Sequence, residues 1–278
     1  QALTLLFKRG LHEAELPAAT CLENVVFASQ VLLGTGLGVV LFQRIPVFAL
    51  LVIDAASFMG SLVMLFLAER QYVARPASLP VGDPQPVALR WQTLTLRQKR
   101  SLLILPALAA VGSPAMALLP ALAQQINPEN AAGLALPLLF ARSLGQLCGP
   151  LLLRKESLTR FAARSPLLLS CLALFLAAYG LLPFLSAWVV LALGMIFIAH
   201  LASNIVFAAG TFGVLSNFQA IQISAASGKA WRWQTLSASL FTGLAAMTAT
   251  ILGAAQTLYA VSAIALLLVA LVLAHYRE

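Results

Sequence analysis

Charged residues are scarce in this 278-residue sequence: Asp, Glu, Lys and Arg together make up only 9% of it. A soluble domain carries about 25% charged residues, so an ordinary soluble fold is excluded. Hydrophobic residues supply 61% of the chain, and the mean hydropathy is +0.93. Because helices satisfy their own backbone hydrogen bonds in lipid, the sequence predicts an all-α fold, a polytopic membrane helix bundle.

Cysteines and catalytic motifs are also few. The three cysteines, Cys21, Cys148 and Cys171, form no CxxC pair and have no metal-ligand spacing, which favours a role as small packing residues. The sequence contains no phosphate-binding loop, no metal-ligand cluster and no nucleophile–base arrangement. We therefore expect no enzyme activity, no cofactor and no metal site.

Long apolar runs are what the sequence has in abundance. Each is about 20 residues long, enough to cross a bilayer. We predict eight transmembrane helices, at 24–43, 47–68, 101–123, 132–153, 166–184, 187–209, 233–254 and 257–274.

The basic residues lie almost entirely on one side of these runs. Arg44 is on the opposite side and Arg142 lies within a run, whereas the remaining fifteen share one side: Lys8, Arg9, Arg70, Arg75, Arg90, Arg97, Lys99, Arg100, Arg154, Lys155, Arg160, Arg164, Lys229, Arg232 and Arg277. By the positive-inside rule this side is cytoplasmic, which predicts a multi-pass protein of the inner cell membrane with a cytoplasmic C-terminus. Topology accounts for the net charge of +8, so we expect no nucleic-acid partner.

Two runs precede a proline-rich cytoplasmic segment and six follow it. The stretch ELPAATCLENVVFASQVLLGTGLGVVLF resembles the fifth helix of the major facilitator superfamily, and Asp54-Ala55-Ala56-Ser57-Phe58 resembles a signature of its sixth helix in the drug-exporter branch. The chain is thus similar to a transporter of that superfamily without helices one to four. The resemblance implies the last two helices of an N-terminal half at 1–68, a linker at 69–100 and a six-helix C-terminal half at 101–278.

This resemblance implies secondary active transport by alternating access. The expected activity is ion-gradient-driven export, as by an antiporter, of a small amphipathic or hydrophobic solute, with protons as one possible coupling ion. A lipid substrate is an alternative, because the bacterial lysophospholipid transporters have a similar glycine run in helix five. A further alternative is a membrane scaffold or regulatory subunit that does not transport. The expected partners are the lipid bilayer, the solute, and helices one to four from the rest of the chain or from another protein.

Arg142 is the leading candidate for the transport pathway. A charged side chain at mid-bilayer costs about 2.5–3.5 kcal/mol on insertion scales, so such a residue generally faces a bundle interior or a wet cavity. It could bind an anionic group of the solute or pair with an acid that changes protonation. A structural ion pair is the alternative.

Other candidates lie on helices that line the cavity in the similar family. His200 and Asn204 are four residues apart and share a helix face, although ordinary packing would also explain a histidine there. Ser113 and Met116 lie on a run that prolines bend, and shape alone could explain the bend. Asp54 is a candidate for proton coupling, but we favour a structural role for it.

Two glycine pairs complete the set. Gly34 with Gly38, and Gly145 with Gly149, have the spacing that lets helices approach closely. In the similar family the corresponding helices pack across the two halves, which implies an interdomain helix seam. Ordinary helix packing is the alternative. Glu23 and Asn24 are predicted to cap the first run.

Overall fold

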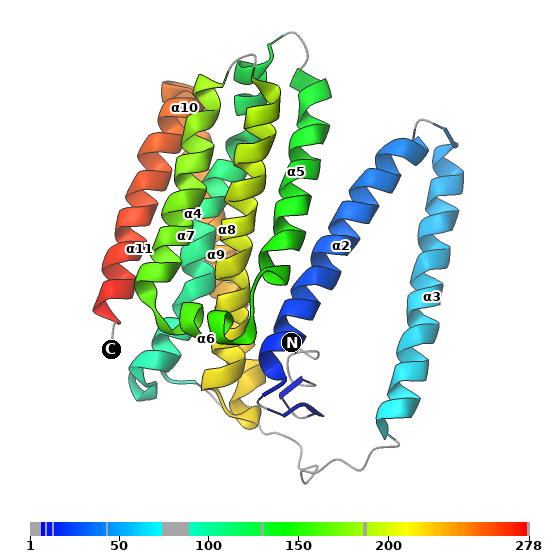
Figure 1. The fold of residues 1–278 in the computed structure, drawn as a ribbon, viewed down its shortest axis with the longest axis vertical. Helices are drawn as coiled ribbons and strands as arrows, with labels where there is room; N and C mark the ends of the chain where they lie inside the picture. Colours follow the sequence, from blue (N-terminus) through cyan, green and yellow to red (C-terminus); the bar gives the residue numbers. More distant parts are fainter. Residues whose placement is uncertain are drawn as a thin grey trace. The chain divides into compact units, whose positions relative to one another are not determined.

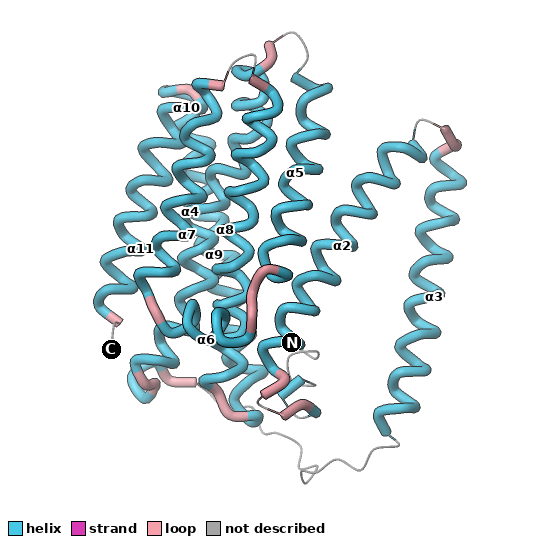
Figure 2. The backbone as a smooth tube through the Cα atoms, in the orientation of Figure 1, coloured by secondary structure: helices cyan, strands magenta, loops and turns pink. Residues whose placement is uncertain are grey.

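A computed structural model shows an all-helical chain (Figure 1). It describes residues 7–8, 10–12, 14–42, 44–73, 89–128, 131–185 and 188–276, and these contain no β-strand (Figure 2). The α-helices are α2 (Leu16–Phe42), α3 (Val47–Val73), α4 (Leu96–Ile126), α5 (Ala131–Leu151), α6 (Lys155–Ala163), α7 (Ser165–Leu181), α8 (Val189–Asn217), α9 (Ala220–Leu252), α10 (Ala254–Thr257) and α11 (Ala263–His275). Short 3₁₀ turns lie at Trp91–Thr93 (η1) and Leu182–Phe184 (η2), and a π-helical turn, η3 (Leu258–Ser262), joins α10 to α11.

Seven of the helical segments in the described residues are long and apolar enough to cross a membrane. They are Leu16–Gly34, Val47–Ala68, Leu96–Ile126, Ser165–Phe184, Val189–Asn217, Ala220–Leu252 and Ala254–His275. This is the architecture of a multi-pass α-helical membrane protein. The predicted run 132–153 is also helical, as α5, but it is not among the seven, so the predicted count of eight spans is not confirmed.

The chain divides into two compact units. The larger unit contains Gln1–Ser29 with Pro86–Glu278, and the smaller unit contains Gln30–Gln85. Helix α2 therefore gives its first half to the larger unit and its second half to the smaller one. Of the linker predicted at 69–100, residues 69–73 belong to α3, residues 96–100 begin α4, and residues 74–88 lie outside the described residues.

Helix α4 is central to the larger unit. It packs along α8 and α9 and also contacts α5, α7 and α11, while α5 packs along α8. Its interior face is built of small and aliphatic residues such as Leu102, Val111 and Leu122, all completely buried. Pro106, Pro114 and Pro120 lie inside the helix, and each removes one backbone donor. A hydroxyl from α9 binds at the first of these sites: Ser237 Oγ donates to the Pro106 carbonyl at 2.9 Å.

Polar side chains define the helix ends at one end of this bundle. Thr95 and Gln98 form a reciprocal capping box at the start of α4, and Gln219 forms one with Gln222 at the start of α9. The Asn217 amide at the end of α8 donates to Ser101 Oγ on α4 at 2.9 Å. These bonds fix where α8 ends and α9 begins relative to α4.

An aromatic cluster joins the same helices near their ends. The Trp91 ring in η1 packs edge-on against Trp233 of α9 at 5.2 Å and against Tyr276 at 5.7 Å between ring centroids. Lys229 Nζ lies 5.0 Å from the centroid of the Trp233 ring, and Lys99 Nζ lies 5.6 Å from that of Trp91. Such cation–π contacts anchor a helix end while leaving the ammonium groups near water.

Candidate functional site

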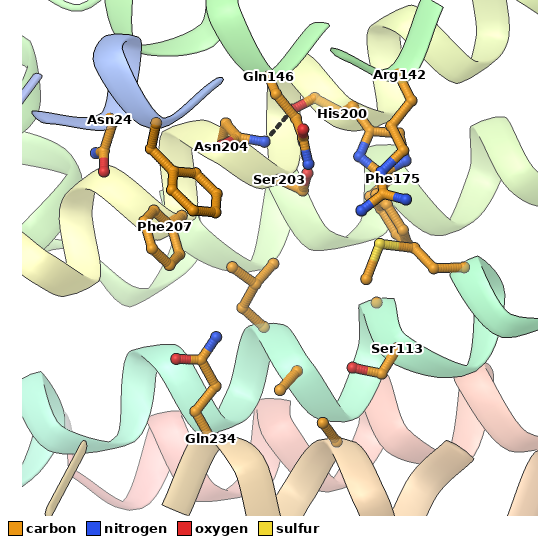
Figure 3. A pocket seen from close by; sticks show the side chains of 16 residues that line it. Asn24, Ser113, Arg142, Gln146, Phe175, His200, Ser203, Asn204, Phe207 and Gln234 are labelled. Carbon is orange, nitrogen blue, oxygen red and sulfur yellow. Dashed lines mark hydrogen bonds between the residues drawn. The ribbon is translucent and has the colours of Figure 1, made fainter. Parts of the chain in front are cut away.

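The larger unit contains a partly open cavity of about 190 Å³. Helices α2, α4, α5, α7, α8 and α9 all contribute side chains to it. The lining residues are Asn24, Phe27, Leu108, Ala109, Gly112, Ser113, Met116, Arg142, Gln146, Phe175, His200, Ser203, Asn204, Phe207, Gln234 and Ala238. Figure 3 shows Arg142 and Ser113 toward one end of the cavity and Asn24 and Gln234 toward the other.

The cavity brings together most of the pathway residues that the sequence predicts. Arg142 comes from α5, Ser113 and Met116 come from α4, and His200 and Asn204 come from α8. They are up to 91 positions apart in the chain, so only helix packing can place them around one space. Their role in transport stays a prediction.

Asp54 is not part of this lining. It lies on α3, in the smaller unit, with an exposed side chain. The hydroxyl of Ser57 donates to its backbone carbonyl at 2.7 Å, a local bond within the helix. A role for Asp54 in proton coupling stays a prediction.

Two glycines set the distance between α5 and α8, the helices that carry most of the polar side chains in the lining. A Cβ atom on Gly145 would meet the Phe197 carbonyl oxygen of α8, and one on Gly149 would lie 2.7 Å from the Leu201 carbonyl oxygen. Both glycines therefore let α5 contact the backbone of α8 directly, which places Arg142 and its neighbours opposite the α8 side chains. The other glycine pair lies in the smaller unit, where a Cβ on Gly34 would meet no described atom within 4 Å. The seam predicted to join Gly34 and Gly38 with Gly145 and Gly149 stays a prediction.

His200 is held firmly in the wall of the cavity. Its side chain is 1% exposed, and its Nε2 atom shares a hydrogen bond of 2.8 Å with the hydroxyl of the buried Tyr179 on α7. The Phe175 ring packs edge-on against the imidazole at 5.6 Å between centroids. The other ring nitrogen, Nδ1, has no hydrogen-bond partner among the described residues. His200 is therefore held at one nitrogen, and the other is buried in the wall without a partner among the described residues.

Asn204 and Ser203 bind the backbone of His200. The Asn204 amide donates to the His200 carbonyl at 3.0 Å (Figure 3), and the Ser203 hydroxyl donates to the same carbonyl at 3.1 Å. Since the serine donates to a carbonyl, it is not activated by the imidazole. The described lining thus holds no serine–histidine nucleophile pair.

Arg142 has no acidic partner in the part of the chain that the structure describes. No described carboxylate forms an ion pair with it, and its Nε is buried with no hydrogen-bond partner there. The described lining also contains no carboxylate at all. The described lining consequently carries one positive charge and no negative charge.

Sequence reasoning missed three amides in the lining: Asn24, Gln146 and Gln234. The predicted helix cap at Glu23 and Asn24 is wrong, because α2 already begins at Leu16 and Asn24 is a buried residue within it. Gln146 lies one helical turn after Arg142, and Gln234 is a polar residue in an apolar run, so both carried a detectable signal. Asn24 Nδ2 and Gln234 Oε1 are buried without a hydrogen-bond partner among the described residues.

Apolar side chains complete the lining. Phe27, Phe175 and Phe207 come from three different helices, and Leu108 and Met116 come from a fourth. A partly open space with aromatic walls, amide groups and one guanidinium is suited to bind a small molecule with both apolar and polar parts.

Comparison of the chain with known proteins gives no matching family, no matching curated protein and no matching solved structure.

Proposed function

We propose that this protein is a secondary active transporter of the inner cell membrane, with its C-terminus in the cytoplasm. It exports a small amphipathic solute by alternating access, driven by an ion gradient, and it is not an enzyme. The resemblance of its sequence to the major facilitator superfamily suggests this reading. The observation that carries the proposal is the cavity with Arg142 in its wall, lined by α5 and by five helices of membrane length.

The cost of placing Arg142 there supports a functional role. An arginine within a bundle of apolar helices is expensive, and such residues face a cavity or a partner. Here the side chain lines a cavity and no described carboxylate compensates its charge. A role in solute binding explains why the charge is present.

The pairing of α5 with α8 also supports the proposal. Two helices in direct backbone contact through small residues pack closely and can move as one rigid pair. Alternating access requires rigid helix groups of this kind around a fixed site. The cavity would then open to one side of the membrane and to the other in turn.

Transport can be tested with the protein reconstituted into proteoliposomes. An imposed pH gradient should drive flux of a small amphipathic solute in the wild type and not after Arg142→Ala. Exposed Arg154 supplies the matched control, and Arg154→Ala should keep the flux. Absence of gradient-dependent flux in correctly inserted wild type, with dyes, lipids and small amphipathic solutes, would favour the scaffold alternative.

A further inference from the structure

We infer that the solute of this cavity is a small organic monoanion with an apolar or aromatic body, a carboxylate of about the size of benzoate. The inference rests on the transport function proposed above, since it names the class of solute. Three properties of the lining support it: its charge, its polar side chains and its volume.

The charge of the lining selects an anion. Arg142 is the one side chain in the described lining that is charged at every physiological pH, and no carboxylate there opposes it. A guanidinium binds a carboxylate through two parallel hydrogen bonds, which are among the stronger interactions in proteins. A second negative charge on the solute would find no second cation in the described lining. The site therefore favours one negative charge over two.

Polar side chains at one end of the lining show where the carboxylate would bind. Arg142 lies toward the end of the cavity where Ser113 also points inward (Figure 3), which places the carboxylate there.

The hydrogen bond to Tyr179 is compatible with a neutral His200 imidazole. The Tyr179 hydroxyl can donate to Nε2, which leaves the proton on Nδ1, the nitrogen without a partner among the described residues. In that tautomer the imidazole adds no charge to the cavity wall. Tyr179 then acts as a positioning residue for His200.

The volume of the cavity limits the size of the solute. An engineered cavity of about 150 Å³ binds benzene, whereas pockets for drug-sized molecules measure about 300–1,000 Å³. At about 190 Å³, this cavity suits a single ring or short branched chain with one carboxylate. The apolar body would contact Phe207 and Leu108, which belong to the same lining.

Binding can be measured with the whole chain in lipid nanodiscs, using benzoate as the probe. Benzyl alcohol and benzylamine have similar shapes but are neutral and cationic. Benzoate should bind at least tenfold more tightly than either in isothermal titration calorimetry. Arg142→Gln should weaken benzoate binding by about tenfold or more and leave benzyl alcohol binding unchanged, because a lost charge-assisted pair has an effect of this size.

Two variants keep this test decisive. Arg142→Lys retains the charge and should bind benzoate more tightly than Arg142→Gln, provided both variants elute as monodisperse protein. Arg154→Gln removes an exposed arginine outside the lining and should bind as the wild type does. Equal binding of the three probes, or equal binding of benzoate by wild type and Arg142→Gln, would overturn the inference.

Exchange of radiolabelled benzoate in proteoliposomes separates this inference from the transport function. Tight benzoate binding together with exchange supports both. Tight binding without exchange would support the solute class and contradict transport. Gradient-driven dye flux without benzoate binding would support transport and overturn the solute class.

Discussion

Helices α4 and α3 have nearly the same hydropathy and opposite environments. In an apolar 18-residue window of α4, 67% of the residues are buried, whereas in the corresponding window of α3 the figure is 0%. The apolar residues of α4 face other helices, while Phe58, Met64 and Leu65 of α3 are each at least 68% exposed. Hydropathy alone therefore cannot tell a helix at the centre of a bundle from one with an open surface.

Residue type does distinguish the two helices. α4 carries three prolines and the small residues Gly112 and Ser113, which suit close packing and a cavity wall. α3 is built mostly of large aliphatic and aromatic residues, which suit contact with lipid chains. The cavity consequently depends on small residues that let helices approach, and these positions should be the most sensitive to substitution.

The largest effect is expected from Gly145→Leu. The new side chain cannot fit, because its Cβ would already meet the Phe197 carbonyl oxygen, and α5 must move away from α8. Inserting extra side-chain atoms into a well-packed core costs about 1–3 kcal/mol. The cost should be larger here, because the new side chain meets backbone atoms, which move less readily than side chains. We expect loss of most monodisperse protein in size-exclusion chromatography and a lower Tm in what remains.

Gly60 of α3 provides the matched control. A Cβ at Gly60 would meet no described atom within 4 Å, and leucine is a better helix former than glycine. Gly60→Leu should leave the yield and the Tm unchanged or slightly higher. Similar losses in both variants would show that a glycine packed against another helix, as Gly145 is on α5, is no more sensitive to substitution than the exposed Gly60 on α3.

An intermediate effect is expected from Tyr179→Phe in the cavity wall. The substitution leaves both ring nitrogens of His200 without a partner among the described residues, and a buried polar group left unpaired costs about 1–3 kcal/mol. Tyr259→Phe removes a similar bond, from its hydroxyl to the Gly180 carbonyl at 2.7 Å. Since Tyr259 is 38% exposed, its loss should cost less.

A double-mutant cycle tests the Tyr179–His200 pair directly. Tyr179→Phe, His200→Leu and the double variant are compared by thermal unfolding in detergent. Residues in contact typically show a coupling energy of about 0.5–3 kcal/mol. Additive effects would show that the hydrogen bond contributes nothing to stability.

Sequence patterns predict the helical fold and much of the site for clear physical reasons. Burying a polar residue in an apolar membrane segment costs free energy, so such residues stand out in the sequence. Arg142, His200 and Asn204 could be chosen as site candidates for this reason. Their common location follows from the packing of α4, α5 and α8, which the sequence alone does not specify. The Gly145–Gly149 pair predicts close helix packing, but its spacing does not name the partner, and the structure places α8 there.

Helix boundaries near polar residues are harder to predict. Glu23 and Asn24 look like a helix cap because polar residues favour such positions, yet α2 begins about two turns earlier, at Leu16. In the same way, the basic ends of α3 and α4 have the composition of a linker although they are helical. Local composition cannot show that tertiary packing buries a polar residue in the middle of a helix, as it does Asn24.

The smallest effect is expected from Ser237→Ala, which removes a single hydroxyl. It compares a hydrogen bond between two helices with one inside a single helix. Ser237 Oγ bridges α9 to the Pro106 carbonyl of α4, whereas Ser61 Oγ on α3 donates to the Ser57 carbonyl of its own helix. Hydrogen bonds between membrane helices contribute about 0.6 kcal/mol on average, so Ser237→Ala should lower the stability by about that amount. Ser61→Ala should cost less, because alanine favours the helix and no contact between helices is lost. A difference of this size requires reversible unfolding in mixed micelles with replicate measurements. Equal effects of the two variants would mean that the bond to α4 adds no more than a bond within one helix, and that the packing of small residues alone joins α4 to α9.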